Sequence, residues 1–367
     1  MSDRMERKMT GVYFTLVGIT LIIVFVLALT VGRYKISVVD FFKMLFGGEG
    51  YEIERSVVLK LRLPRTIVAA LTGTALSVSG LLYQETFQNR LVSPDLLGVS
   101  SGAGVGAALA IVIGASSVFV SFFAFVFGVF TVLATTFVAK SFKNKSSMAL
   151  TLSGIIVGGF MGAVLSFIKY LADAETTLAS ITFWLMGSFE QSTMADVYVL
   201  LPIVIICSIV ILSIGWRVNI VALGREEAQT KGINYRLYRA IIIIVATLLT
   251  ASSVAFSGTI GWIGLVVPHI VRLTVGRDTK KAIPMCMLFG ATFMIIADIL
   301  SRVFTAAEVP LSAVTGFFGT IVFVVLLFIR RDSIRENDGR KKYFFQVSEE
   351  VPAGIKRREF FLRKRHG

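Results

Sequence analysis

The sequence predicts an all-α polytopic membrane protein with about ten transmembrane helices. Of the 367 residues, 55% are hydrophobic and only 16% are charged, and the mean hydropathy is +0.79. A soluble domain carries roughly 25% charged residues, whereas a helix that crosses a bilayer needs about 20 mainly apolar residues. Ten apolar runs of such length occur, at residues 11–31, 65–82, 96–113, 117–139, 148–168, 196–214, 238–256, 260–275, 283–301 and 312–329.

Two of these runs need a separate justification. The run at 11–31 follows Arg4, Arg7 and Lys8 and so resembles a signal peptide. It is longer than a signal h-region and lacks a small-x-small cleavage site, which predicts a retained first span. The run at 260–275 is short and contains Pro268. We expect a kinked or partly re-entrant helix there, in which neighbours satisfy the carbonyl that the proline leaves free.

The distribution of basic residues predicts the topology. Ten spans place both termini on one side, and this side carries 28 of the 37 Lys and Arg residues. The positive-inside rule therefore assigns both termini and the segment 217–239 to the cytoplasm. The predicted organisation is a cytoplasmic N-terminus over 1–10, a ten-helix transmembrane domain over 11–330 and a basic cytoplasmic tail over 331–367. The outer segment 33–62 is an exception, since it carries six basic residues.

Glycines recur at a spacing of four residues in two of the runs. They are Gly98, Gly102 and Gly106, followed by Gly154, Gly158 and Gly162. Residues four apart lie on one face of a helix, and small residues there let two backbones approach closely. The pattern indicates close helix packing, and therefore a compact bundle rather than loosely held spans.

The motifs that would indicate an enzyme are absent from the sequence. It contains no GxxxxGK[ST] phosphate loop, no HExxH and no GxSxG. Cys207 and Cys286 both lie in apolar runs, and His269 and His366 are the two histidines, so the sequence predicts neither a disulfide framework nor a metal site. We therefore predict a transport subunit that binds no cofactor of its own.

A transporter needs an energy source, and one candidate is an ionisable group within the membrane. Asp298 lies near the outer end of the ninth run with Arg302 four residues later, a spacing that favours a structural ion pair over a proton site. Glu85 ends the second run and is expected to be solvated. An ion-coupled secondary transporter of a small solute that uses Asp298 remains the alternative hypothesis.

The polar segment 217–239 separates two strongly apolar runs. The seven residues between Gly224 and Gly232 can form about two helical turns, roughly 10 Å long. Gly232 suits a C-cap, and Ile220, Leu223 and Ala228 give this helix an apolar side. The segment is therefore either an ordinary connection or a short surface helix that docks onto a cytoplasmic partner.

This segment resembles the ATPase-contacting loop of FecCD-type permeases, the ABC importers of ferric siderophores, haem and cobalamin. The family pattern NxLxLGxxxAxxLG is met by Asn219, Leu223, Gly224, Ala228 and Gly232, with Val221 and Lys231 in place of leucines. Further family blocks follow in order: LRLPRTIVAALTGTALSVSGLLYQ (61–84), SPDLLGVSSGAGVG (93–106), WLMGS (184–188), GTIGWIGLVVPHIVR (258–272) and ADILSR with EVPLSAVTG (297–316).

The resemblance implies a type II ABC importer permease in a bacterial cell membrane, most often with an iron chelate such as a siderophore as cargo. It implies a dimer with a second permease subunit, two ATPase subunits that bind ATP and Mg, and an extracytoplasmic substrate-binding protein. The ATPase-coupling residues that it implies are Asn219, Leu223, Gly224, Arg225, Glu226, Glu227, Ala228, Lys231 and Gly232.

The resemblance also implies two other sites. Arg62, Arg65 and Arg302 match the arginines that dock the binding protein, and Glu308 is expected to orient one of them. Asn89 and Leu91, with Ser146 and Ser147, match the two loops of the cytoplasmic gate. The sequence departs from the family at Arg90 and at Thr320–Ile321, where the family pattern has prolines. It also departs at Trp262, where the family has phenylalanine.

Overall fold

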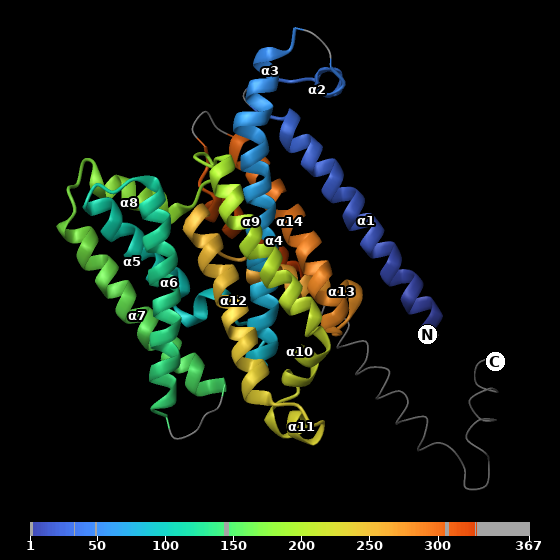
Figure 1. Cartoon of the computed structure of the whole chain (residues 1–367), viewed down its shortest axis with the longest axis vertical. Coiled ribbons are helices and arrows are strands. Elements are labelled where there is room, and N and C mark those ends of the chain that lie inside the picture. The colour runs from blue at the N-terminus through green and yellow to red at the C-terminus, as the bar shows by residue number, and fades with distance from the viewer. Residues whose placement is uncertain are drawn as a thin grey trace. The chain divides into compact units, whose positions relative to one another are not determined.

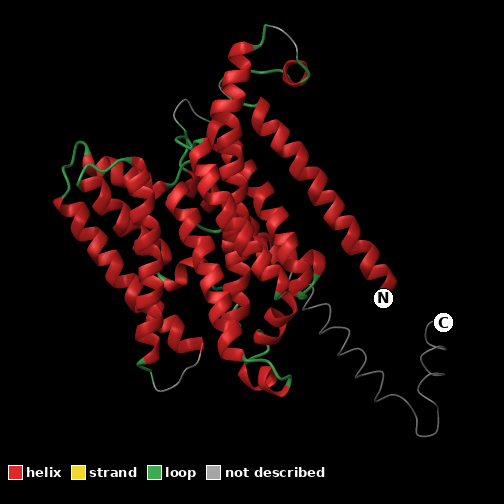
Figure 2. Cartoon of the chain, in the orientation of Figure 1, coloured by secondary structure: helices red, strands yellow, loops and turns green. Residues whose placement is uncertain are grey.

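The computed structural model describes residues 3–32, 34–47, 50–142, 147–304, 308–326 and 328, which form helices and no strand (Figure 2). Two compact units are distinguished, residues 1–319 and residues 320–367. The predicted basic tail, 331–367, lies outside the described residues. The first helix begins at Asp3 and runs through most of the predicted N-terminal segment 1–10, whose cytoplasmic location stays a prediction.

All ten predicted runs correspond to helices. They are α1 (Asp3–Thr30), α4 (Leu63–Phe87), α5 (Val99–Val112), α6 (Ser117–Lys140), α7 (Ser147–Leu171), α9 (Met194–Ser213), α12 (Tyr235–Ser257), α13 (Ile263–Val275), α14 (Thr279–Val303) and a last helix, Leu311–Leu326. Seven helices of the described chain are long and apolar enough to cross a membrane. The last helix, α5 and α13 are shorter, as is α8 (Thr177–Met186), which the sequence analysis did not predict.

Helix α4 lies at the centre of the first unit, between α12 and α14 (Figure 1). Its glycines let two other backbones approach it closely. A Cβ at Gly73 would lie 2.1 Å from the carbonyl oxygen of Gly290 in α14, and a Cβ at Gly80 would lie 2.0 Å from that of Gly264 in α13. These contacts hold three helices together by backbone proximity, which is how helices pack where lipid provides no hydrophobic drive.

The predicted glycine face of α5 packs against α6. A Cβ at Gly102 would lie 1.9 Å from the hydroxyl of Thr131, and a Cβ at Gly106 would lie 2.3 Å from the carbonyl oxygen of Phe123. Neither atom can move far, because both belong to the neighbouring helix. The packing interpretation of this glycine series is therefore confirmed.

The glycine series of α7 is confirmed only in part. A Cβ at Gly154 would lie 2.2 Å from the carbonyl oxygen of Leu96, and one at Gly158 would lie 3.4 Å from the Cα of Gly98. Gly162 has no atom of the described chain within 4 Å of its Cβ position, so the prediction of a packing role within this chain is wrong there.

Helix α13 is short, as the sequence predicted. Its 13 residues span about 20 Å, less than the roughly 30 Å of a bilayer core. Pro268 inside the helix cannot donate to the carbonyl of Gly264, and the side-chain amide of Gln84 in α4 donates to that oxygen at 3.2 Å. A neighbouring helix thus satisfies the carbonyl that the proline leaves free.

A small helical segment precedes α4 beyond the C-terminal end of α1 (Figure 1). It contains α2 (Val38–Leu45), α3 (Glu52–Ser56) and a π-helix, η1 (Val57–Arg62), which runs directly into α4. Its own apolar cluster includes Leu29, Phe41 and Val58. This segment carries part of the unusual positive charge of residues 33–62.

Candidate docking and coupling sites

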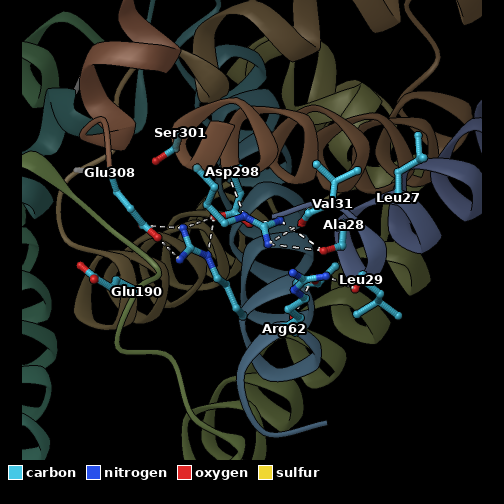
Figure 3. Close-up of polar contacts among 12 residues, drawn as sticks. Leu27, Ala28, Leu29, Val31, Arg62, Glu190, Asp298, Ser301 and Glu308 are labelled. Carbon is cyan, nitrogen blue, oxygen red and sulfur yellow. Dashed lines mark hydrogen bonds and ion pairs between the residues drawn. The ribbon is translucent and has the colours of Figure 1, made fainter. Parts of the chain in front are cut away.

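The three candidate docking arginines lie together at the end of the bundle where α1 and α14 finish. Arg62 ends η1, Arg65 is in the first turn of α4 and Arg302 is in the last turn of α14. They are only 6%, 7% and 8% exposed. These three residues are hereafter the arginine cluster; Figure 3 shows Arg62 beside the end of α1, with Asp298 and Glu308 nearby.

Arg65 binds both acidic residues. Its Nη1 and Nη2 donate to the two carboxylate oxygens of Glu308 at 2.7 and 2.8 Å, and its Nε donates to Asp298 Oδ1 at 2.8 Å. A guanidinium that holds a carboxylate with two parallel hydrogen bonds is geometrically fixed. Glu308 therefore orients Arg65, as predicted, and the start of α4 is bonded both to α14 and to the segment that follows it.

Arg302 makes the predicted ion pair with Asp298. Its Nη2 lies 3.0 Å from Asp298 Oδ2. This contact is an ion pair without the alignment of a hydrogen bond, and Oδ2 accepts no hydrogen bond from the described residues. Arg302 also donates to the carbonyl oxygen of Ala28 at 3.4 Å. The carboxylate of Asp298, fully buried, thus lies between two guanidinium groups, which is the geometry of a structural ion pair.

Arg62 caps the C-terminal end of α1. Its Nη1 donates to the carbonyl oxygens of Leu29 and Thr30, both at 2.8 Å, and its Nη2 donates to that of Tyr34. The last carbonyls of a helix have no partner within the helix and attract cations. Among the described residues no carboxylate pairs with Arg62, so carbonyl dipoles alone compensate its charge.

The guanidinium groups of the arginine cluster thus already have partners within the chain. Exposed cations lie on the adjacent segment, at Lys35, Lys43, Arg55 and Lys60. A carboxylate from another protein can reach these four without displacing an internal contact. The docking role of Arg62, Arg65 and Arg302 stays a prediction.

The polar segment at the opposite end of the bundle forms two short helices, α10 (Gly215–Val221) and α11 (Arg225–Thr230). Gly232, at φ +71°, follows α11. Its N–H donates to the carbonyl oxygen of Gln229 at 3.0 Å, and the N–H of Ile233 donates to that of Ala228 at 2.9 Å. This pair of bonds is a Schellman motif, which confirms the predicted helix and its glycine cap.

The apolar side of α11 differs from the prediction at one residue. Ile220, Ala228 and Ile233 form a small buried cluster. Leu223, which the sequence analysis placed on this side, is 52% exposed because the turn at Gly224 directs it outward. Arg225, Glu226, Glu227 and Lys231 are exposed as well, so the surface around α11 combines one apolar side chain with both charge signs.

Asn219 connects α10 to the start of α14. Its Nδ2 donates to Asp278 Oδ1 at 2.8 Å, and its Oδ1 accepts from the backbone N–H of Thr279 at 2.8 Å. The hydroxyl of Thr279 donates to the carbonyl oxygen of Gly215 at 2.6 Å. A displacement of α10 would therefore act directly on α14.

Gln88 makes the corresponding connection to α4. It ends α4 in the left-handed conformation, at φ +53°, and its Nε2 donates to the carbonyl oxygen of Ala222 at 3.0 Å. The same Nε2 would lie 3.2 Å from a Cβ at Gly224. Sequence reasoning missed Gln88, although a helix end in the predicted gate loop was a signal that pointed to it.

The candidate gate residues are only partly within the described chain. Asn89 Oδ1 accepts from the N–H of Leu91 at 3.0 Å, which forms a tight turn, and Leu91 is 65% exposed. Ser147 begins α7, while Ser146 lies outside the described residues. Their role as a gate stays a prediction.

Glu85 is not solvated as the sequence analysis expected. Its Oε1 lies 3.3 Å from Arg272 Nη1, and Arg272 also donates to the side-chain carbonyl of Gln84. The basic end of α13 lies beside the end of α4, and the pairing with Arg272 offsets only part of the cost of burying Glu85. This ion pair adds a connection between α4 and α13.

The comparisons with known proteins agree with this architecture. The model of the FecCD transport family matches residues 20–329. The molybdate import system permease protein MolB of Haemophilus influenzae is 36% identical over 88% of this chain and 97% of its own length. A probable iron chelatin transport system permease protein of Helicobacter pylori is 35% identical over 75% of this chain and 83% of its own. A solved structure described as an inward-facing metal-chelate type ABC transporter has a TM-score of 0.79 and 34% identity, and covers 87% of this chain and 99% of that one.

Proposed function

The chain belongs to the FecCD transport family, as a membrane-embedded permease subunit of an ABC importer rather than an enzyme, and from this premise we propose that it carries a ferric siderophore by alternating access. The observation that carries the proposal is the family match over residues 20–329, together with the capped helix α11 between two spans. The iron chelatin relative and the metal-chelate type structure favour a metal chelate as cargo.

Molybdate is a second candidate cargo. It is favoured by the Haemophilus relative, of which this chain matches 97%. Uptake of radiolabelled iron as a siderophore complex, compared with radiolabelled molybdate, separates the two in cells that lack the gene and in complemented cells. Loss of siderophore uptake alone supports the proposal. Loss of molybdate uptake with normal siderophore uptake would overturn it.

We further propose that two such permeases form a dimer, with both termini in the cytoplasm, on two ATPase subunits that bind ATP and Mg. The exposed residues around α11 would contact the ATPases. Because Asn219 bonds α10 to α14 and Gln88 bonds the turn before α11 to α4, a movement of α11 would pull on both helices. Alternating access would follow as a shift between two arrangements of the bundle.

Charge reversal at Glu226 and Glu227 tests this coupling. Both carboxylates are exposed in the first turn of α11, so the double substitution to Lys leaves the packed side of the helix intact. We expect ATP hydrolysis without transport, while the double substitution to Asp transports normally. Coupled transport in the double-Lys variant would contradict the role of α11.

We propose that an extracytoplasmic binding protein docks at the end that carries the arginine cluster. The buried arginines would hold α1, α4 and α14 in register under the docking surface, and a docking carboxylate would contact them only by replacing an internal partner. The exposed Arg55 and Lys60 would supply the first electrostatic attraction.

The two contributions are separable by mutation. Arg55→Glu with Lys60→Glu should weaken association with the binding protein without lowering the melting temperature. Arg62→Gln should lower the melting temperature, because it removes the cap of α1. Unchanged affinity for the binding protein in both variants would remove this face from the docking proposal.

The ion-coupled alternative is wrong, because the chain is an ABC importer permease. The structure agrees, since Asp298 has two arginine partners and no exposed surface.

A further inference from the structure

A cavity of about 650 Å³ opens between α6, the start of α7 and α12, at the end of the bundle that carries α11. Its volume is in the range of natural ligand cavities, which is about 300–1,000 Å³. The Asn219 and Gln88 connections lie on α10 and α4, which do not line it, and Arg225 at the start of α11 is the one proposed coupling residue that does.

The cavity is apolar along its length, and that length matches one membrane leaflet. On α12 its lining runs from Tyr235 to Leu248, and on α6 from Lys140 back to Val129. At 1.5 Å per residue, the part of α12 from the last cation, Arg239, to Leu248 spans about 13 Å, and the stretch on α6 about 16 Å. Half of a bilayer core of roughly 30 Å is about 15 Å, so the cavity reaches from the membrane interface to the midplane.

The cavity also opens at the outer surface of this subunit. Leu133 of α6 and Ile244 of α12 both line it and are 64% and 58% exposed. Large apolar side chains exposed on a spanning helix contact either lipid or a second subunit, and we infer that these two contact lipid. An acyl chain would then enter sideways from the bilayer.

Cations gather at the interfacial end of the cavity. They are Lys140, Arg225, Arg236 and Arg239, and the lining contains no Asp or Glu. Arg239 stacks on the ring of Tyr235 at 5.8 Å, while its Nε and Nη2 are buried and have no hydrogen-bond partner among the described residues. Buried donors of a charged group are costly to leave unpaired, so an anion fits this position.

We propose that the cavity binds an anionic phospholipid, with its phosphate on Arg239 and Arg236 and one acyl chain along α6 and α12. A free anion would use the cations but not the apolar length, and a zwitterionic lipid would add a like charge beside them. Basic pockets between helices on the cytoplasmic side suit such headgroups. Since Arg225 begins α11, the bound headgroup also lies against the helix proposed to contact the ATPases.

Native mass spectrometry of the full-length purified permease tests the proposal. We expect phosphatidylglycerol to stay bound at least tenfold more than phosphatidylcholine of the same chains. Arg239→Gln should reduce phosphatidylglycerol binding about tenfold. The matched control is Arg217→Gln, because Arg217 also stacks on a tyrosine, Tyr238 at 5.1 Å, but does not line the cavity.

A steric variant tests the acyl-chain position independently. Ile244→Trp places a large ring in the mouth of the cavity and should also lower phosphatidylglycerol binding. Leu237→Trp, on an exposed residue of α12 outside the cavity, should not. Monodisperse elution on gel filtration verifies the fold of each variant.

Three outcomes would overturn the proposal: equal retention of the two lipids, equal losses in Arg239→Gln and Arg217→Gln, or displacement of phosphatidylglycerol by millimolar inorganic phosphate. The last outcome would show a site for a free anion instead of a lipid.

Discussion

Replacement of Asp298 by Asn removes one charge from the arginine cluster and keeps the shape of the side chain. Asp298 is fully buried and contacts Arg65 at 2.8 Å and Arg302 at 3.0 Å. Breaking a buried ion pair by removing one partner costs about 3–5 kcal/mol. Because Arg65 keeps Glu308, we expect the lower end, about 3 kcal/mol. At about 2 °C per kcal/mol for a long chain, the melting temperature falls by roughly 6 °C.

The assay is thermal unfolding of the purified permease in detergent, paired with uptake in proteoliposomes that contain the complete importer. We expect Asp298→Asn to lose stability and to transport, when folded, with the same pH dependence as the unmodified protein. Glu308→Gln is the matched control, since the Glu308 side chain is 15% exposed and its loss should cost less. An unchanged melting temperature with abolished uptake would refute the structural role of Asp298.

Three further substitutions test the packing and the coupling connections. Gly80→Ala should prevent stable assembly of the helices, because its Cβ would lie 2.0 Å from the carbonyl oxygen of Gly264. The yield of folded protein on gel filtration measures this effect, and Gly162→Ala, whose Cβ has free space, is the control. Equal yields of the two variants would contradict the packing account. Asn219→Leu should keep ATP hydrolysis but lower transport severalfold, because it removes the bonds between α10 and α14. An unchanged ratio of hydrolysis to transport would contradict a coupling role of Asn219. Gly232→Ala should destabilise α11 by about 1–2 kcal/mol, because the φ of residue 232 is +71°. It should also reduce the amount of ATPase that co-purifies with the permease. Full recovery of the ATPase would be evidence against the role of α11 in ATPase contact.

The ten helices of the apolar runs, and their order, were predictable because each span has to satisfy the bilayer by itself, whereas the short α8 was not. A run such as 117–139 is apolar throughout, whatever its neighbours are, and it became α6 (Ser117–Lys140). The cap of α11 was equally local, since a glycine at φ +71° follows the helix that it ends. The sequence predicted that the carbonyl left free by Pro268 needs a hydrogen-bond donor from a neighbour. It could not predict which residue provides that donor.

Errors arose where a side chain depends on a helix distant in sequence. Glu85 looked solvated because Arg272, its partner, is 187 positions later in the chain. Arg62 and Arg65 looked like surface residues because their carbonyl and carboxylate partners come from α1, α14 and the segment after α14, whereas the pair of Arg302 with Asp298 was predictable from their spacing. A polar residue at a predicted helix end carries no local signal that tells burial from exposure.

By itself the sequence determined a membrane-embedded helical bundle, its short polar helix and, through ordered motifs, its family. These features depend on composition and on residues close together in the chain. Only the tertiary structure decided that the arginine cluster is internally paired, that Gln88 and Asn219 join α10 to α4 and α14, and that the cations beside α6 and α12 border an apolar cavity. The physical reason is that burial and pairing are properties of neighbouring helices, whose approach depends on contacts such as Gly80 with Gly264.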